Sequence, residues 1–319
     1  LMPRVLLITN PAAARTDARA VLSVRDTLRG AGWRVEVLAT AAPGDARRFA
    51  TEAAGEGHGG FDALLSVGGD GTAMQVAAGL VGSGIPLGLV PGGTGNILAR
   101  NLRLPIDPVR AARAILKGTP YPMDLGRMPR ADGDHFFAVC AGAGYDAQIM
   151  AATDTMFKRR WKIAAYFIKA LTTLPQVKSV AHRVTIDGTE HHLDAAMVLV
   201  ANCRELVPRV VNVSPAVWPN DGVLDVIALR ADGAWDSVVS FATFLRTRGA
   251  SDRSGRIWSA RGRTIKVEVP DGTPRRVQLD GELVGSTPFD VDVVPGALTV
   301  LVDPATVPGG VGKGSSNGR

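Results

Sequence analysis

The chain has 319 residues, long enough for two ordinary domains, and 46% of them are hydrophobic, which supports a sizeable core. The formal net charge of +6 suits an anionic partner such as a phosphate-bearing ligand or an anionic lipid surface. No run of about eighteen apolar residues occurs and the N-terminus lacks a signal-peptide layout, so we expect a cytoplasmic protein without a membrane-spanning helix. The 2 cysteines are too few for a cysteine-based metal site and are expected to be reduced thiols.

Up to residue 122, apolar runs of strand composition alternate with runs of helical composition. Strands are expected at residues 5–9, 34–39, 64–68 and 85–90, and helices at 12–31, 45–54, 73–80, 97–102 and 107–117. Regular alternation of strand and helix predicts a doubly wound, mostly parallel sheet. We therefore expect residues 1–122 to form one α/β domain.

A glycine-rich turn follows the third expected strand. The strand runs directly into Gly68-Gly69-Asp70-Gly71-Thr72, and a helix-like run comes next. Glycines let the backbone approach a ligand closely, and a helix N-terminus offers free N–H groups and partial positive charge. The segment therefore predicts a phosphate site, in which Asp70 is better suited to face a magnesium ion or a hydroxyl than a phosphate. The alternative is an ordinary strand-to-helix turn, where Gly and Asp are common.

A second turn of the same kind follows the next expected strand. Its sequence is Pro91-Gly92-Gly93-Thr94-Gly95-Asn96, and it again precedes an expected helix. In an open α/β sheet, ligands bind at the carboxyl ends of the strands. The two turns therefore predict a nucleotide-binding site on one edge of the sheet.

From residue 123 the expected strands follow one another without helices between most of them. They lie at 135–141, 181–187, 195–202, 224–229, 264–269, 275–280, 289–294 and 297–302. This pattern predicts an antiparallel, sandwich-like all-β domain over residues 123–302, interrupted by helices at 155–174 and 236–246. Residues 303–319 are rich in Gly, Pro and Ser and are expected to be a disordered tail.

Three further patterns are weaker. Residues 142–147 fit a dinucleotide-binding pattern but lack the helix, strand and acidic residue that should follow, so a nicotinamide site is not predicted. His191-His192 is expected in a loop, where no nearby ligand completes a metal site. The helix at 155–174 carries basic residues beside aromatic ones. It can rest on an anionic membrane or pack on the sandwich with its lysines in solvent, and both interpretations stay open.

Taken together, the motifs resemble those of the diacylglycerol kinase catalytic family, in the bacterial branch that includes sphingosine-kinase-like proteins. The resemblance covers residues 3–302 and rests on segments that match in order and spacing: Gly68–Thr72, Pro91–Asn96, Asp124–Gly126, Gly142–Ala147, Asn220–Asp225 and Leu279–Glu282. It implies a nucleotide-binding α/β domain followed by a β-sandwich that takes the lipid substrate.

The resemblance implies an ATP- and Mg²⁺-dependent lipid kinase of phospholipid biosynthesis. Such an enzyme transfers the γ-phosphate of ATP to a hydroxyl of a membrane lipid, either diacylglycerol-like or sphingoid. Its partners would be the lipid and an anionic membrane surface touched from the cytoplasm, and no nucleic acid. Free edges of the sandwich would also allow a homodimer.

The resemblance also implies site residues. The general base would be Asp280 or Glu282, with Asp70 as a further catalytic residue on the nucleotide or magnesium side. A structural magnesium ion would be held by the Asp221 side chain and by the carbonyl groups of Trp218 and Val223. The residues expected around ATP are Asn10, Thr40, Gly68, Gly69, Asp70, Gly71, Thr72, Thr94, Gly95 and Asn96.

Two other functions are kept as alternatives. A kinase of the NAD-kinase type, with a soluble acceptor, shares the first glycine turn. A non-catalytic lipid- or nucleotide-binding protein is suggested by two departures from the family pattern. Ile97 stands where many members have Asp, and Ala12-Ala13-Ala14-Arg15 stands where a glycine-bearing loop is usual.

Overall fold

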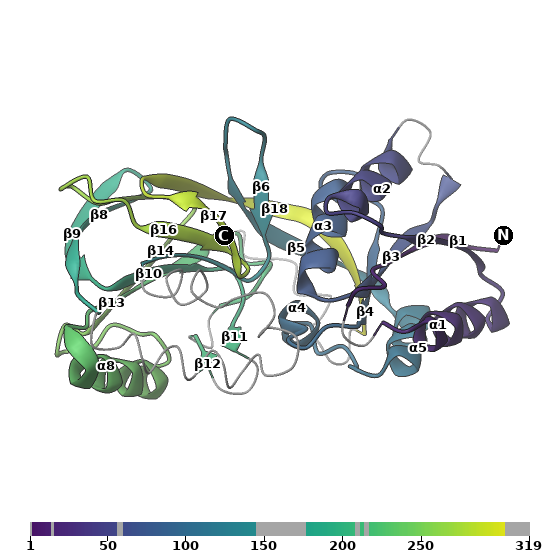
Figure 1. Cartoon of the computed structure of the whole chain (residues 1–319), viewed down its shortest axis with the longest axis horizontal. Coiled ribbons are helices and arrows are strands. Elements are labelled where there is room, and N and C mark those ends of the chain that lie inside the picture. The colour runs from purple at the N-terminus through teal and green to yellow at the C-terminus, as the bar shows by residue number, and fades with distance from the viewer. Residues whose placement is uncertain are drawn as a thin grey trace, which may run out of the picture. The chain divides into compact units, whose positions relative to one another are not determined.

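The computed structural model divides the chain into two units, which are described separately (Figure 1). One unit joins Leu1–Met123 to Gly296–Arg319, and the other is Asp124–Pro295. The expected fold class is confirmed, because the first unit is α/β with a parallel sheet and the second is an antiparallel β-sandwich. The structure describes residues 2–13, 16–55, 60–144, 177–207, 211–213 and 217–303.

The first unit is built on a parallel sheet. Its strands are, in spatial order, β2 (Arg34–Ala39), β1 (Arg4–Thr9), β3 (Ala63–Gly68), β4 (Leu87–Pro91) and the C-terminal part of β18 (Phe289–Val302). Every residue of β3 and β4 is buried, as expected of strands covered on both faces. The last strand pairs with β4 through Val300 and Leu87.

Helices cover both faces of this sheet. Helices α1 (Ala18–Gly30) and α5 (Pro108–Lys117) pack together on one face, and α2 (Asp45–Ala54) and α3 (Asp70–Leu80) on the other (Figure 1). The expected helix at 12–31 is shorter, because the Asp17 carboxylate accepts the N–H of Ala20 and caps α1 there. A short helix, α4 (Ile97–Asn101), follows β4.

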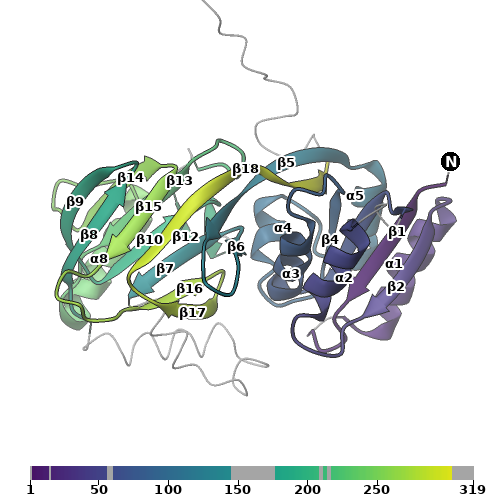
Figure 2. The same cartoon turned by 90° about the horizontal axis from the view of Figure 1, so that it is seen from above.

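The second unit consists of two antiparallel sheets packed face to face. Figure 2 shows β18, β15 and β8 side by side in the first of them, which continues to β9. The second sheet has the order β14-β13-β10-β7-β16-β17. The core of the second unit lies between the two sheets and includes Phe137, Val200, Val226, Val267 and Val291. The strands not yet bounded are β5 (Thr119–Met128), β6 (His135–Phe137), β7 (Cys140–Gly144), β8 (Val180–Ile186), β9 (Thr189–Ala195), β10 (Met197–Ala201), β11 (Glu205–Val207), β12 (Val211–Asn212), β13 (Leu224–Leu229), β14 (Ile257–Gly262), β15 (Thr264–Glu268), β16 (Arg276–Leu279) and β17 (Glu282–Ser286).

Three details of the sandwich differ from the sequence-based expectation. The single strand expected at 135–141 is split into β6 and β7, because the intervening N–H groups bind a side chain rather than a neighbouring strand. His191 and His192 lie in β9, not in a loop. Because this edge strand is polar, its sequence lacks the alternation of apolar residues that predicts a strand. The strands expected at 289–294 and 297–302 form one strand, β18.

One helix of the second unit is described. Helix α8 (Gly233–Thr247) matches the insertion expected at 236–246, whereas the helix expected at 155–174 and the tail 303–319 fall almost wholly outside the described residues. Phe244 of α8 packs on the outer face of the second sheet, against Leu199, Ile227 and Ile257. In the part of the chain that the structure describes, no helix is long and apolar enough to cross a membrane.

Candidate active site

The two glycine turns of the first unit lie backbone against backbone at the carboxyl ends of β3 and β4. The N–H of Gly92 donates to the carbonyl of Gly68 at 2.6 Å. A Cβ atom on Gly93 would come within 2.6 Å of the Gly69 Cα, and one on Gly69 would lie 3.4 Å from the Gly93 Cα. The close approach of the turns therefore requires glycine at Gly93. The expected strand–turn–helix arrangement and the common edge are both confirmed.

The first turn leaves the N-terminus of α3 open. Helix α3 begins at Asp70, three residues earlier than expected, and its N-cap Gly69 has no side chain that could cap it. The first N–H groups of a helix have no intrahelical acceptor. Gly71 is exposed there, so the end of α3 can accept a phosphate group from solvent. Thr94 of the second turn is exposed as well, and Gly95 is half-buried.

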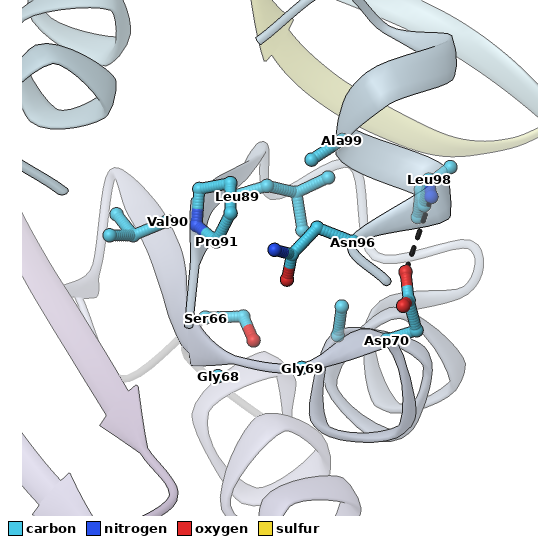
Figure 3. A pocket seen from close by; sticks show the side chains of 11 residues that line it. Ser66, Gly68, Gly69, Asp70, Leu89, Val90, Pro91, Asn96, Leu98 and Ala99 are labelled. Carbon is cyan, nitrogen blue, oxygen red and sulfur yellow. Dashed lines mark hydrogen bonds between the residues drawn. The ribbon is translucent and has the colours of Figure 1, made fainter. Parts of the chain in front are cut away.

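Asp70 joins the two turns. Its Oδ1 accepts the N–H of Leu98 at 3.2 Å, so the carboxylate caps the start of α4 (Figure 3). Burial raises the pKa of Asp70 above its ordinary value, and the backbone N–H groups of Leu98, Ile97 and Asn96 oppose that shift. The structure thus assigns Asp70 a contact that its expected role at a metal ion or hydroxyl did not include.

Replacing Asp70 by asparagine separates its capping of α4 from a role at a metal ion or hydroxyl. The amide oxygen can still cap α4, so we expect the protein to stay folded. A carboxyl group with a raised pKa costs the native state stability once it ionises. The stability of Asp70→Asn relative to wild type should therefore increase as pH rises from 3.8 through the higher pKa of the folded protein. Thermal melts across this range, with ATP turnover at neutral pH, check both the cap and any role at the metal.

Asn96 closes the second turn on itself. Its side chain is buried, accepts the N–H of Gly93 at 2.9 Å and donates to the Gly93 carbonyl at 2.9 Å. Behind the turns lies a cavity of about 10 Å³, lined by Ser66, Asp70, Asn96 and their neighbours (Figure 3). That volume holds at most about one water molecule, so this cavity is not a nucleotide pocket.

Asn10 and Thr40 also lie at the carboxyl edge of this sheet. The Asn10 side chain donates to the hydroxyl of Thr72 at 3.2 Å, which connects the end of β1 to the first turn. The N–H of Thr40 donates to the carbonyl of Thr9 at 2.9 Å, just beyond β2. The residues expected around ATP therefore come from the ends of neighbouring strands; their role as ligands stays a prediction.

In the second unit, the Asp280 carboxylate binds a row of backbone groups. Its Oδ2 accepts the N–H of Ala138 at 2.7 Å, and its Oδ1 accepts those of Val139 at 2.9 Å and Cys140 at 2.8 Å. A carboxylate has about four lone-pair positions, and these bonds use three of them. Asp280 itself has a positive φ of 46°, which a short polar side chain tolerates. Asp280 thus holds the segment between β6 and β7.

Glu282 is arranged differently. It is the first residue of β17, and its side chain is exposed and makes no hydrogen bond or ion pair with the described residues. The residue between the two acids is Gly281, which has no side chain. Its N–H donates to the Gln278 side chain at 2.7 Å. Of the two acidic residues expected to supply a base, Glu282 has the more exposed side chain, and which of the two acts as the base stays a prediction.

A buried network that sequence reasoning missed supports this region. Asn202 donates its amide group to the carbonyls of Asp124 and Ala138, each at 2.9 Å. The Asp124 carboxylate accepts the N–H of Gly222 at 2.7 Å. Three of the motifs quoted above, those containing Asp124, Gly222 and Asp280, are thereby linked by hydrogen bonds. Asn202 stands in an ordinary apolar strand sequence, so no local signal could have identified it.

At the expected magnesium site, Asp221 forms an ion pair with Arg261. Asp221 Oδ1 accepts the N–H of Val223 at 3.2 Å, and its Oδ2 binds Arg261 Nη2 at 2.5 Å. The same guanidinium holds Asp225 through Nε at 3.0 Å. Burial raises the pKa of Asp225, and the adjacent Arg261 opposes that shift. Arg261 competes with a divalent ion for Asp221, and a magnesium ion held by Asp221 and the carbonyls of Trp218 and Val223 stays a prediction.

We expect the thermal stability of the wild-type protein to be the same in EDTA and in magnesium. In Arg261→Gln the carboxylates of Asp221 and Asp225 lose their partner, which should cost about 1–2 kcal/mol, because Asp225 is buried while Arg261 is partly exposed. Magnesium should then restore part of the loss. Thermal shift measurements check this, with Arg253→Gln as the control because Arg253 is exposed and forms no ion pair with the described residues. A melting temperature of the wild type that drops in EDTA would favour the expected metal site.

The other residues considered from the sequence form no second functional site in the part of the chain that the structure describes. Among the described residues, no group of three His, Cys, Asp or Glu side chains could hold a metal ion. Cys140 and Cys203 are free thiols, and burial raises the pKa of Cys203 well above its ordinary value. Tyr145, Asp146 and Ala147 of the dinucleotide-like pattern, and Ala14 and Arg15 of the alanine loop, lie outside the described residues.

Comparison with known proteins identifies the class. Residues 4–128 match the family model "Diacylglycerol kinase catalytic domain", and residues 139–302 match "YegS C-terminal NAD kinase beta sandwich-like domain". The first match ends shortly after Met123, the last residue of the N-terminal part of the first unit, and the second covers most of the second unit. The chain therefore belongs to the diacylglycerol kinase family of lipid kinases, as the motifs predict.

The similarity extends over whole chains. A diacylglycerol kinase of Mycobacterium tuberculosis strain H37Rv is 29% identical over 304 residues, covering 93% of this chain and 94% of the relative. A YegS-like lipid kinase of Xanthomonas euvesicatoria is 30% identical over 292 residues, or 89% and 91% of the two chains. A crystal structure of a candidate diacylglycerol kinase from Bacillus anthracis strain Sterne superposes with a TM-score of 0.77 at 26% identity, covering 95% and 98%. These relatives support lipid kinase activity in general.

Proposed function

We propose that this protein uses ATP with Mg²⁺ to phosphorylate a hydroxyl group of a membrane lipid of the diacylglycerol or sphingoid type. The observation that carries the proposal is the stacked pair of glycine turns beside the uncapped N-terminus of α3. Oriented backbone N–H groups and a helix dipole suit a polyphosphate. Mg²⁺ would enter with ATP and neutralise part of the phosphate charge.

The second unit would supply the group that activates the acceptor. We assign this role to Glu282, because its carboxylate is exposed and unpaired among the described residues. The carboxylate would accept the proton of the lipid hydroxyl, whose oxygen then forms a bond to the γ-phosphorus as the bond to ADP breaks. Asp280 would act as a positioning residue that fixes the backbone beside the β16–β17 turn.

A labelled-phosphate assay with a panel of acceptors tests the proposal. The protein is incubated with γ-labelled ATP, Mg²⁺ and detergent-dispersed lipids that include diacylglycerol, monoacylglycerol and a sphingoid base. We expect label in at least one lipid and none when Mg²⁺ is omitted.

Two further arms of the assay address the alternatives. Label transferred to NAD and to no lipid would favour a soluble-acceptor kinase. Stabilisation of the protein by ATP in a thermal shift assay, with no product on any acceptor, would favour a non-catalytic binding protein.

A further inference from the structure

Helix α8 of the second unit has its apolar face turned outward. Its residues on the sheet side include Ser237, Ser240 and Thr243, which are buried, together with Phe244. A surface helix of a globular protein normally buries its apolar stripe and exposes its polar side. In α8 the arrangement is reversed.

The exposed stripe is made of large side chains. Trp235 is 79% exposed, Val238 47%, Phe241 46% and Leu245 39%. Spacings of three, three and four residues place these four on one side of the helix. We call these four residues the α8 stripe. A continuous exposed apolar surface of this kind marks a contact with a partner or a membrane.

Hydrogen bonds of the buried hydroxyl groups explain how α8 can pack its polar side against the sheet. The Ser240 hydroxyl donates to the Arg230 carbonyl at 2.6 Å, and that of Ser237 donates to the Gly233 carbonyl at 2.7 Å. The Thr243 hydroxyl donates to the Val239 carbonyl at 2.8 Å. Small side chains with satisfied hydroxyl groups let α8 lie close to the sheet. The apolar side is therefore free for a function other than folding.

Positive charges lie at the C-terminal end of the stripe, whereas the acidic residues at its N-terminal end, Asp232 and Asp236, are paired with arginines. Arg246 and Arg248, at the C-terminal end of the helix, and Arg253 in the following loop are exposed and form no ion pair with the described residues. An apolar stripe bordered by free arginines matches an anionic bilayer, in which the aromatic rings reach the acyl boundary and the arginines meet the headgroups.

We propose that α8 is the segment by which this protein docks on an anionic lipid surface. The inference rests on the proposed function, because a kinase with a lipid acceptor must reach its substrate in a bilayer. A membrane is favoured over a second copy of the chain, since a second copy would bring the same arginines and a net charge of +6 to the contact.

Vesicle flotation of the full chain without nucleotide tests the proposal. We expect the protein to float with vesicles of phosphatidylcholine and phosphatidylglycerol, and much less with phosphatidylcholine alone or at high salt. The double variant Trp235→Ser/Phe241→Ser should bind at least about tenfold more weakly. Replacing Arg246 or Arg248 by Gln should weaken binding about fivefold each. The matched control is Leu22→Ser on α1, because Leu22 is 44% exposed and lies in the other unit.

Two readouts separate the outcomes. Binding of the double variant equal to that of the wild type, or a wild-type protein that does not float, would overturn the proposal. So would a wild-type dimer that the double variant converts to a monomer without any change in flotation, because a second copy would then cover the stripe. Activity on detergent-dispersed lipid should be the same in the double variant and the wild type. If neither protein has activity, the proposed function fails, while flotation still judges the docking surface.

Discussion

Replacing Gly93 by alanine is expected to weaken ATP binding between about tenfold and about a hundredfold. The new Cβ would lie 2.6 Å from the Cα of Gly69, and a backbone atom cannot move aside as a flexible side chain could. Overpacking of this kind costs about 1–3 kcal/mol and would push the two turns apart. The free N–H groups at the start of α3 would then no longer face the same ligand as the second turn.

Titration calorimetry with ATP measures the effect, alongside a thermal melt. The control is Gly30→Ala, because a Cβ on Gly30 meets no atom within 4 Å and Gly30 has no positive φ. We expect the control to bind ATP like the wild type. Unchanged affinity in Gly93→Ala would show that the stacked turns are not the nucleotide site.

Replacing Glu282 by glutamine is expected to lower kcat by about 10²–10⁴-fold while leaving the melting temperature unchanged. The amide keeps the size of the side chain but cannot accept the proton of a hydroxyl. No stability should be lost, because the Glu282 side chain is exposed and makes no hydrogen bond or ion pair with the described residues. Replacing Asp280 by alanine should act differently. It removes the acceptor of three backbone N–H groups and should cost about 2–4 kcal/mol of stability.

Steady-state kinetics and melts of the two variants distinguish a base from a positioning residue. Glu190→Gln serves as control, since Glu190 is an exposed acid on the edge strand β9. If Glu282→Gln retains full activity, Glu282 is not the base, and Asp280 remains the other acidic residue of that turn. ATP affinity should be unchanged in Glu282→Gln, because we assign nucleotide binding to the first unit.

The parts of the site that could be predicted are those written in consecutive residues. Gly68–Thr72 and Pro91–Asn96 each join a strand to a helix, so local sequence was enough to place them at one sheet edge. Helix α2 matched its expected bounds at Asp45–Ala54, because its alanine face and its ends are visible in the sequence. The family assignment rested on the same short motifs.

The parts that could not be predicted depend on residues far apart in the chain. Asp280 binds N–H groups about 140 positions earlier, and this contact splits an apolar run that otherwise reads as one strand. Arg261 of β14 reaches Asp221 in the turn before β13, which no spacing rule anticipates. Gly296 onward belongs to the first unit, because the end of β18 pairs with β4.

Helix α8 shows a different limit. Its sequence has a clear apolar side, and periodicity alone would assign that side to the core. The structure instead buries Ser237, Ser240 and Thr243 and exposes Trp235. Hydrophobic periodicity identifies the faces of a helix, but only the tertiary structure decides which face meets the protein.

The transfer of phosphate to lipid is the central claim, and one measurement tests it most directly. Purified protein is given γ-labelled ATP, Mg²⁺ and diacylglycerol or a sphingoid base in detergent micelles, and the lipid extract is analysed for labelled product. We predict a labelled phospholipid with the wild type and at least about a hundredfold less with Glu282→Gln. Folded wild-type protein that binds ATP yet labels no lipid would contradict the account.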